Sequence, residues 1–376
     1  MSRKKILHIT YDMRIGGTEM VIKNIIEGAN TDLLNMSIFC IEQPLGPWGV
    51  DLKKEGISVA SIARKDGFDF SVVTRLRALI KYQKIDVVHC HQYTPWVYGA
   101  AAAFGTKAKV IFTEHGRFHP DSSSWKRRFV NPILALVTYK ITAISHATRQ
   151  ALSNYEFLSS RGIEVIYNGI QGLIADEDKV LDIKQSLNIQ EGEFVFGTIA
   201  RLDPIKNHRM MLNAFSSTLK SMPTAKLIIV GDGELMDTLK SLIDKLNISN
   251  NVILTGYIPY PKDYLAVFDI FLLSSLSEGT SMTLLEAMSL SKPCIVTDAG
   301  GNKEIVTNKE TGLVSDNDDM QQFSDAMLTL AKDASTTAEY GLAAKQRFDA
   351  KFDVTHMTAG YQRLYDAERF AMEFTI

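Results

Sequence analysis

Short apolar runs alternate with longer helical segments along almost the whole sequence. The runs are nearly continuous in apolar residues, as in strands that are buried on both faces of a sheet. The intervening segments are long enough to hold a helix, which lets consecutive strands run parallel. We predict strands at residues 6–11, 36–41, 58–62, 86–89, 109–113, 141–145 and 164–167, and then at 194–200, 225–230, 252–255, 270–273, 293–297 and 311–314. The pattern predicts an α/β protein built on doubly wound parallel sheets.

The chain has 376 residues, which is too long for one ordinary domain and suits two α/β domains. Asn168 and Gly169 follow the last strand of the first set, and an acidic helical segment begins at Asp176. We therefore expect a first domain over residues 1–170 and a second domain over residues 171–356.

Composition excludes several classes of protein. The net charge is −2, so no overall basicity indicates nucleic-acid binding. The three cysteines, Cys40, Cys90 and Cys294, lie in separate apolar runs, which argues against a disulfide framework. No apolar stretch reaches the ~20 residues of a membrane-spanning helix. The apolar run behind the basic N-terminus is too short for a signal peptide. We expect a cytoplasmic protein.

A glycine pair, Gly16-Gly17, stands between the first strand and a helical segment. Such a turn places backbone N–H groups at the carboxyl edge of a parallel sheet, where ligands bind. The spacing differs from G-x-G-x-x-G, which disfavours a nicotinamide cofactor. An ordinary strand-to-helix turn is the alternative interpretation.

Histidines occur at strand ends in the first half of the chain. His89 and His91 share one face of a strand end. They could hold a metal ion, but hydrogen-bonded histidines are the better expectation because no acidic residue accompanies them at ligand spacing. His115 precedes Gly116 at the end of the next strand. A ligand-binding role and a structural role are both open for His115.

A basic loop follows the first strand of the second half, with the sequence Arg201-Leu202-Asp203-Pro204-Ile205-Lys206. Arg201 and Lys206 can converge on a diphosphate, the arginine as a bidentate donor and the lysine as a point charge. Solvated surface charges are the alternative. The turn expected at Asp203-Pro204 favours phosphate binding.

A third cluster stands at the start of a helical segment. Gly279 can allow a ligand to approach the backbone or can take a positive φ, and Thr280 or Ser281 can cap the helix. The free N–H groups at such a helix start attract an anion. Two acids, Glu278 and Glu286, have seven residues between them. Glu286 has apolar neighbours on most sides, so we expect it to be buried and to need hydroxyl partners; a narrow exposed stripe is the alternative.

Residues 125–129 join two aromatic side chains to three consecutive basic ones, and Pro132 follows. The proline is expected to kink or restart any helix there. We expect a helix that covers the sheet and has a solvated basic edge. The alternative is an interfacial patch that contacts anionic lipid.

Together these features resemble the retaining glycosyltransferases of the GT-B fold, family GT4. The matching features occur in family order along nearly the whole chain. They are the Gly16-Gly17 loop, His115, Asn168-Gly169, the R-L-x-x-x-K element from Arg201 to Lys206, Gly231-Asp232-Gly233, Gly256-Tyr257-Ile258, and the E-x7-E element from Glu278 to Glu286. The resemblance implies two Rossmann-like domains that face a cleft, with a last helix over residues 357–376 that crosses back to the first domain.

The resemblance also implies roles for single residues. Arg201 and Lys206, together with the helix start, would hold the diphosphate without a metal ion. Glu278 would bind sugar hydroxyls, Glu286 the ribose, and His115 would approach the sugar. The expected catalytic residues are therefore His115, Arg201, Lys206 and Glu278. The expected donor-binding residues are Gly16, Gly17, Asn168, Arg201, Lys206, Gly231, Tyr257, Ile258, Glu278, Gly279, Thr280, Ser281, Met282 and Glu286. No metal and no cofactor are expected.

The function that the resemblance implies is transfer of a sugar from a nucleotide-diphosphate sugar to an acceptor hydroxyl, with the anomeric configuration retained. A UDP-sugar is the expected donor and GDP-mannose the alternative. The acceptor would be a saccharide or a lipid-linked molecule in bacterial polysaccharide, lipopolysaccharide or glycolipid synthesis, with the enzyme at most peripheral to the inner face of the membrane. A nucleotide-sugar epimerase of the same fold and a non-catalytic nucleotide-sugar-binding protein are the alternative functions.

Overall fold

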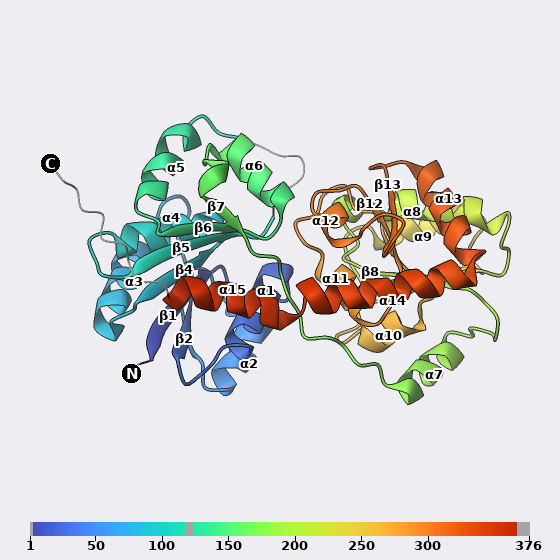
Figure 1. Cartoon of the computed structure of the whole chain (residues 1–376), viewed down its shortest axis with the longest axis horizontal. Helices are drawn as coiled ribbons and strands as arrows, with labels where there is room; N and C mark the ends of the chain where they lie inside the picture. Colours follow the sequence, from blue (N-terminus) through green and yellow to red (C-terminus); the bar gives the residue numbers. More distant parts are fainter. Residues whose placement is uncertain (1–2, 117–122, 367–376) are drawn as a thin grey trace. The chain divides into compact units, whose positions relative to one another are not determined.

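The computed structural model of the protein describes residues 3–116 and 123–366 (Figure 1). They form two compact units. The first contains the described residues up to Gly169 together with those from Val354 onward, and the second contains Ile170 to Asp353. Each unit is built on its own sheet and is described separately below.

The first unit holds a seven-stranded parallel sheet with the order β3-β2-β1-β4-β5-β6-β7. Its strands are β1 (Lys4–Thr10), β2 (Leu34–Cys40), β3 (Ser58–Ser61), β4 (Val87–His91), β5 (Lys109–Glu114), β6 (Lys140–Ala143) and β7 (Ile163–Val165). Its helices are α1 (Gly17–Glu27), α2 (Pro47–Lys54), α3 (Phe70–Gln83), α4 (Tyr93–Ala103), α5 (Arg127–Leu136), α6 (His146–Glu156) and α15 (Val354–Asp366).

The two faces of this sheet have different chemistry, because successive side chains of a strand point to opposite faces. Leu7 and Ile9 of β1 pack into the apolar core that the sheet forms with α3 and α4. His8 points to the other face, and in register it lies opposite His89 of β4. That face is covered by α15, whose Tyr365 bonds to His89. A polar cluster of histidines therefore lies beneath α15.

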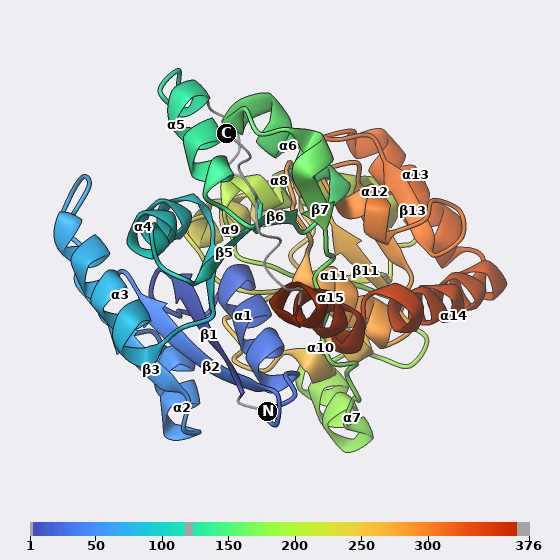
Figure 2. The ribbon, with the colours of Figure 1, turned by 60° about the vertical axis from the view of Figure 1, so that its left-hand side comes forward.

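Helix α15 is the predicted C-terminal helix, and it returns the chain to the first unit. It begins at Val354 rather than Met357, and residues 367–376 of the predicted helix lie outside the described residues. It runs beside α1 (Figure 2). A Cβ at Gly28, where α1 ends, would lie 2.7 Å from Thr358 Cγ2, so the missing side chain permits this close approach.

The second unit holds a six-stranded parallel sheet with the order β10-β9-β8-β11-β12-β13. Its strands are β8 (Val195–Ile199), β9 (Lys226–Val230), β10 (Val252–Gly256), β11 (Ile270–Leu273), β12 (Cys294–Thr297) and β13 (Gly312–Ser315). Its helices are α7 (Glu177–Ser186), α8 (His208–Leu219), α9 (Met236–Lys245), α10 (Lys262–Val267), α11 (Met282–Ser289), α12 (Asn302–Ile305), α13 (Met320–Ala331) and α14 (Ala334–Lys351). The prediction of two doubly wound parallel sheets is confirmed.

The direction of winding reverses once in each sheet. The reversal lies between β1 and β4 in the first sheet and between β8 and β11 in the second. In open parallel sheets, ligands bind outside the carboxyl ends of the two strands at such a reversal. In the second unit, these are the strands that precede the predicted phosphate loop and the predicted two-acid element.

Pro132 was expected to kink or restart a helix. The helix does not restart there, because α5 continues through Pro132 from Arg127 to Leu136, and a kink at Pro132 stays a prediction. The helix is held on the protein from the side by Asn131, whose side-chain amide donates to the backbone oxygen of Glu156 at 2.9 Å. Packing of this kind can outweigh the loss of one backbone bond at a proline.

Candidate active site

In the second unit, the loops after β8 and β11 are bonded to each other. The amide of Leu276 donates to the backbone oxygen of Ile205 at 2.7 Å, and the hydroxyl of Ser274 donates to that of Lys206 at 2.8 Å. The Lys206 ammonium lies 2.6 Å from Glu278 Oε1. The structure thus brings two predicted catalytic residues into direct contact, although they are far apart in the sequence.

Glu278 is held from several sides. Its Oε1 accepts from the Ser275 hydroxyl at 2.6 Å as well as from Lys206. Its backbone oxygen accepts from the amide of Gly301 at 3.1 Å. Gly300 has a φ of +56°, and a Cβ there would lie 1.9 Å from that same oxygen. Gly300 is therefore a glycine that a positive φ and a close backbone approach require at this site, whereas Gly279 does not have a positive φ.

Arg201 begins the loop after β8 and remains largely exposed. Its guanidinium contacts Asp203 Oδ2 at 2.7 Å, and Asp203 Oδ1 accepts from the amide of Lys206 at 3.1 Å. The turn predicted at Asp203-Pro204 is the short 3-10 helix Pro204–Lys206, with Asp203 as its cap. One carboxylate thus orients the arginine and shapes the loop that carries the lysine. Two cations are held at one sheet edge, as a diphosphate requires.

Gly231 fits closely against the same loop. Its φ is +147°, and a Cβ there would lie 2.0 Å from the backbone oxygen of Ala200, next to Arg201. Tyr257 and Ile258 follow β10, the outer strand on this side of the sheet. Tyr257 is exposed and Ile258 is half-buried. The expected contact of these two residues with a nucleotide base stays a prediction.

Helix α11 begins at Met282 and is capped by Ser281, whose hydroxyl accepts from the amide of Leu284 at 3.4 Å. Of the two predicted caps, the structure selects Ser281; Thr280 is buried just before it. A capped helix start leaves other N–H groups of the first turn available to an anion.

Glu286 lies within α11 between buried apolar neighbours. Its side chain makes no hydrogen bond within the described residues, and burial raises its pKa from 4.5 to about 7. A carboxyl group in such surroundings gains from hydroxyl donors. Glu286 is half-buried, so it does not lie on a fully exposed stripe, and its expected contact with a ribose hydroxyl stays a prediction.

The acidic run at residues 316–319 lies next to the predicted phosphate-binding loops. Asp318 Oδ1 accepts from Asn207 Nδ2 at 2.8 Å, and Asn317 Nδ2 donates to the backbone oxygen of Leu276 at 2.9 Å. The run follows β13, and the carboxyl ends of parallel strands meet at one edge of a sheet. Asp319, the last residue of this run, caps α13 by accepting from the amide of Gln322.

In the first unit, Gly16 and Gly17 begin α1 with extended backbone at Gly16. Glu19 is close enough that its Oε2 would lie 2.6 Å from a Cβ at Gly16. Burial and the nearby charge of Asp12 raise the pKa of Glu19. Two carboxylates near this helix start disfavour a phosphate and suit hydroxyl ligands better. Whether Gly16 and Gly17 contact a donor or an acceptor stays a prediction.

The other predicted residues of the first unit lie at strand ends. Asn168 is buried, and its Oδ1 has no partner within the described residues. Gly169, beside it, is fixed by Asn24, whose amide donates to its backbone oxygen at 3.0 Å. His115 Nε2 lies 2.8 Å from His91 Nδ1. The histidines therefore form hydrogen bonds, as expected, and the contribution of His8 from β1 was not foreseen.

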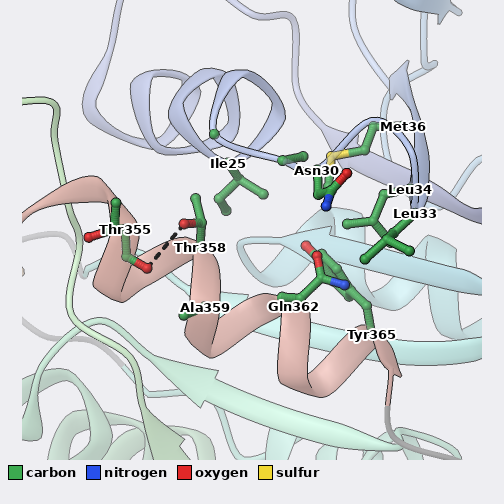
Figure 3. Close-up of a pocket in the computed structure, with 12 residues that line it drawn as sticks. Ile25, Asn30, Leu33, Leu34, Met36, Thr355, Thr358, Ala359, Gln362 and Tyr365 are labelled. Carbon is green, nitrogen blue, oxygen red and sulfur yellow. Dashed lines mark hydrogen bonds between the residues drawn. The ribbon is translucent and has the colours of Figure 1, made fainter.

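A cavity of about 250 Å³ in the first unit lies away from all predicted site residues (Figure 3). Ile25, Leu34, Thr358 and Tyr365 are among its lining residues, which come from α1, the start of β2 and α15. None of the lining side chains is charged. It is therefore unsuited to a diphosphate.

No described helix is both long and apolar enough to cross a membrane. The groups of the candidate site described above could bind a small polar ligand. Two cations and a capped helix start can stabilise a diphosphate, while Glu278 and Glu286 can accept hydrogen bonds from hydroxyl groups.

Two family models match the sequence in succession. The model described as Glycosyltransferase Family 4 matches residues 15–171, and the model described as Glycosyl transferases group 1 matches residues 180–347. The second match contains Arg201, Lys206, Glu278 and Glu286.

Relatives and solved structures agree with these matches. The UDP-Gal:alpha-D-GlcNAc-diphosphoundecaprenol alpha-1,3-galactosyltransferase of Escherichia coli is 27% identical over 346 residues, which cover 88% of this chain and 89% of that protein. The N-acetyl-alpha-D-glucosaminyl L-malate synthase of Bacillus anthracis is 24% identical and covers 81% of each chain. The crystal structure of Anabaena HepE in complex with UDP superposes with a TM-score of 0.86 at 21% identity and covers 96% of this chain and 99% of that one. This last likeness shows a shared fold.

Proposed function

Because this chain belongs to the glycosyltransferases of family 4 and group 1, we propose that it transfers a hexose from a UDP-sugar to a hydroxyl group of a saccharide or lipid-linked acceptor, with retention of the anomeric configuration. The observation that carries the proposal is the contact between Lys206 and Glu278 beside Arg201. It places two cations and a hydroxyl-accepting carboxylate at one sheet edge, which matches the two ends of a sugar diphosphate.

The charges at this edge have separate tasks in the proposed reaction. Negative charge grows on the diphosphate as the bond to the sugar breaks, and Arg201 and Lys206 stabilise that charge. Glu278 orients the sugar through its hydroxyls, and Glu286 accepts from the ribose. The leaving phosphate oxygen takes the proton of the acceptor hydroxyl on the same face of the sugar. No metal ion is required for this division of tasks.

The donor and acceptor classes are supported by the relatives. The name of the E. coli relative specifies UDP-Gal as donor, a diphosphoundecaprenol-linked sugar as acceptor and an α linkage. The Anabaena structure contains UDP. For this chain we therefore expect UDP rather than GDP, and a lipid-linked saccharide rather than a free sugar.

Helix α5 suits an enzyme that works on a lipid-linked acceptor. Four large apolar side chains lie along one side of this region, and each is more than 60% exposed: Trp125, Phe129, Ile133 and Leu136. Lys126 and Arg128 are also exposed. An exposed apolar stripe with neighbouring basic residues is typical of helices that lie in the headgroup region of a membrane. We include peripheral binding to anionic membrane in the proposal.

The first test is a thermal-shift screen of UDP-sugars and GDP-mannose, because a ligand that binds the native state raises the melting temperature. The donor found is then incubated with an undecaprenyl-diphosphate-linked sugar, and the product is identified by mass spectrometry and by the anomeric coupling in its NMR spectrum. A product with inverted configuration contradicts retention, and the absence of transfer with binding intact contradicts the enzyme activity.

The two alternative functions give different results in the same assay. An epimerase changes the donor sugar without an acceptor, and a binding protein leaves the donor intact. Acceptor-dependent release of UDP separates the proposed transferase from both.

A further inference from the structure

Another cavity of the first unit lies at the amino edge of its sheet, where α4 and α5 end and β5 and β6 begin. Its volume is about 410 Å³, which is within the range of pockets that hold small organic ligands. Its walls include Ala103, Ala108 and Val110, which are buried, and Val137, which is half-buried. Of the described residues that line it, Lys109 alone is charged. The cavity therefore suits an apolar ligand whose polar end lies near Lys109.

The hydroxyl groups in the walls of this cavity already bond to the protein. Thr106 Oγ1 donates to the backbone oxygen of Ala103 at 2.7 Å, and Thr138 Oγ1 donates to that of Leu134 at 2.7 Å. Thr138 Oγ1 also accepts from Trp96 Nε1 at 2.8 Å. The protons of both hydroxyls are thus engaged within the protein. A hydrocarbon chain gains by leaving water for such a cavity, because it gives up no hydrogen bond.

The mouth of the cavity carries two exposed apolar side chains. Phe104, which follows α4, is 66% exposed, and Leu136, which ends α5, is 76% exposed. Gly105 continues the chain with a φ of +69°, as the turn into β5 requires. The guanidinium of Arg77, on α3, holds this turn by donating to the backbone oxygen of Phe104 at 2.5 Å. Neighbouring apolar side chains on a surface mark a site of contact with a protein or a membrane.

Two observations favour a membrane whose lipids are anionic. Leu136 is the last member of the exposed apolar stripe that begins at Trp125, so the cavity lies at the end of that stripe. The segment from residue 70 to residue 110, which holds α3, α4 and the turn into β5, has one acidic residue, Asp86. Its basic residues are six: Arg75, Arg77, Lys81, Lys84, Lys107 and Lys109. Basic clusters of this kind are attracted to the negative surface potential of anionic lipids.

We propose that this cavity takes one acyl chain of an anionic membrane phospholipid, with Phe104 and Leu136 in contact with the bilayer and with Lys107 and Lys109 facing the phosphate group. The inference rests on the peripheral membrane binding that the proposed function includes, and it adds a defined lipid site to that binding. The bound lipid anchors the first unit at a fixed place on its surface, beyond the general attraction of α5 for the membrane.

The position of the cavity favours a phospholipid over the prenyl chain of a lipid-linked acceptor. Strand β5 runs from Lys109, at the cavity, to Glu114, at the carboxyl edge of the sheet, a distance of about 20 Å. Ligands of parallel sheets bind at the carboxyl edge, so the sugar of the acceptor is expected there. A lipid held at the amino edge takes no part in the reaction and serves as an anchor.

The tryptophans of the chain give a test that separates docking of α5 from insertion of an acyl chain. Trp125 lies on the exposed stripe, whereas Trp96 is fully buried and bonded to Thr138 in the wall of the cavity. Trp48→Phe combined with Trp125→Phe leaves Trp96, and Trp48→Phe combined with Trp96→Phe leaves Trp125. Each protein is mixed with phosphatidylglycerol vesicles whose acyl chains carry bromine, which quenches tryptophan fluorescence at short range. We expect quenching of both tryptophans relative to vesicles without bromine.

Val137→Phe fills the cavity without adding a polar group, so it should remove most of the quenching of Trp96 while Trp125 stays quenched. Val130→Phe is the matched control, because Val130 lies on α5, is 44% exposed and is absent from the described residues that line the cavity. The control should leave both signals as they are in the parent proteins. Circular dichroism of both variants checks the fold. Brominated phosphatidylcholine vesicles, which carry no net charge, should quench both tryptophans less.

Several results would overturn the proposal. Quenching of Trp125 without quenching of Trp96 would mean that α5 docks while no chain occupies the cavity. Undiminished quenching of Trp96 in Val137→Phe would place the chain elsewhere. If a small fraction of unbrominated undecaprenyl phosphate in the vesicles relieved the quenching of Trp96, the occupant would be a prenyl chain. If the protein formed a dimer without vesicles, and Leu136→Ser dissociated it in sedimentation equilibrium, the surface would be an interface between two copies.

The same experiment distinguishes this proposal from the proposed function on which it rests. Quenching of neither tryptophan would contradict the lipid site and the peripheral membrane binding together. Quenching of Trp125 alone would contradict only the lipid site. Sugar transfer is decided by the transfer assay, and none of these fluorescence measurements requires the donor or the acceptor to be known.

Discussion

Lys206 Nζ lies 2.6 Å from Glu278 Oε1, which joins the loop after β8 to the loop after β11 at the point where the second sheet reverses its winding. The Glu278 side chain is only 9% exposed, while that of Lys206 is 24% exposed. The carboxylate is thus fixed, and the ammonium retains a side open to a ligand. A prearranged pair of this kind can hold two parts of one substrate.

Removing the carboxylate of this pair should affect turnover more than affinity. In Glu278→Ala, the freed Lys206 keeps its charge for the diphosphate, whereas the sugar loses the group that orients it. Loss of a hydrogen bond to a charged acceptor costs about 1.5–3 kcal/mol. We therefore expect kcat to fall some ten- to hundredfold with a small change in KM. Initial-rate kinetics measures both.

The matched control for Glu278→Ala is Asp298→Ala, which breaks the exposed ion pair between Lys303 and Asp298 on a neighbouring loop. Exposed pairs contribute little, so this variant should behave as wild type. If Glu278→Ala raised KM and left kcat unchanged, Glu278 would act in uniform binding rather than in orientation.

Arg201→Ala should lower affinity and turnover together. The guanidinium is 74% exposed and oriented by Asp203, so it is available to a diphosphate whose charge increases in the transition state. Its removal also leaves the Asp203 carboxylate uncompensated beside the ligand. We expect kcat/KM to fall by about a hundredfold, consistent with one lost charge-assisted interaction. Arg201→Lys should recover little, because lysine lacks the bidentate geometry.

Arg209→Ala removes another exposed arginine from the same unit, on α8, and serves as the control. Circular dichroism of both variants checks the fold. Equal kinetics for Arg201→Ala and Arg209→Ala would mean that Arg201 is an ordinary surface charge.

Glu286 should make donor binding depend on pH. Burial raises its pKa to about 7, and its ionised form is the better acceptor for a ribose hydroxyl. Binding therefore favours loss of the proton, and affinity should rise by up to about tenfold between pH 6 and pH 8. In Glu286→Gln the affinity should be weaker at pH 8 and nearly constant with pH. Calorimetric titration with a UDP-sugar measures the affinity at both pH values. If wild type and Glu286→Gln showed the same change in affinity between pH 6 and pH 8, Glu286 would not be the cause of the pH dependence.

The raised pKa of Glu286 should also make the free energy of unfolding depend on pH, in a direction that follows from the shift. The folded pKa is raised, so the unfolded chain loses its proton first, and the free energy of unfolding falls as pH rises from about 4.5 toward 7. Glu286→Gln removes this loss. The variant should therefore melt at a higher temperature than wild type at pH 8 and should lose that advantage near pH 4.

We expect transfer without a metal ion, although the acidic run at residues 316–319 lies near the phosphate-binding loops and carboxylates can hold Mg²⁺. Asp316 and Asp318 accept from Gln322 and Asn207 respectively, so their carboxylates have structural partners. Because Arg201 and Lys206 supply positive charge, we expect full transfer in excess EDTA. Loss of activity with EDTA, with recovery on addition of Mg²⁺ or Mn²⁺, would contradict the prediction. Asp318 would then be the candidate metal ligand.

The strands and the local elements of the site could be predicted from the sequence, because each depends on neighbouring residues. Ser281 as a cap and the turn at Asp203-Pro204 are examples. The contact between Asn207 and Asp318 could not be predicted, because it requires β13 to follow β11 and β12 in the sheet. The sequence analysis also did not identify His8 as part of the histidine cluster, because that too depends on how the strands pair.

The role of His8 depends on the register between β1 and β4, which places it opposite His89. A single histidine inside an apolar run gives no signal of that pairing. Gly300 is likewise explained only by the folded structure, in which its backbone lies against the backbone oxygen of Glu278 and leaves no room for a Cβ. Residues whose role depends on strand order or register are the ones that one sequence does not reveal.

Binding of α5 to anionic membrane should depend on Lys126 and Arg128 but should be tested without changing Arg127. Arg127 bonds to the buried carboxylate of Glu156 at 2.6 Å, so its loss would leave a buried charge unpaired and destabilise the helix. Each basic residue near an anionic surface contributes about 1 kcal/mol. Changing Lys126 and Arg128 to Ser should therefore weaken binding to phosphatidylserine-containing vesicles by roughly thirtyfold.

The apolar stripe and the basic residues can be separated in the same sedimentation experiment. Phe129→Ser should weaken binding at low and high salt alike, because apolar burial is not screened, whereas the effect of the basic pair should vanish at high salt. Lys53 and Lys54, which are exposed at the end of α2, changed together to Ser provide a control with the same loss of charge. If that control lowered binding as much as the change in α5, the attraction would come from net charge alone and α5 would be an ordinary solvated helix.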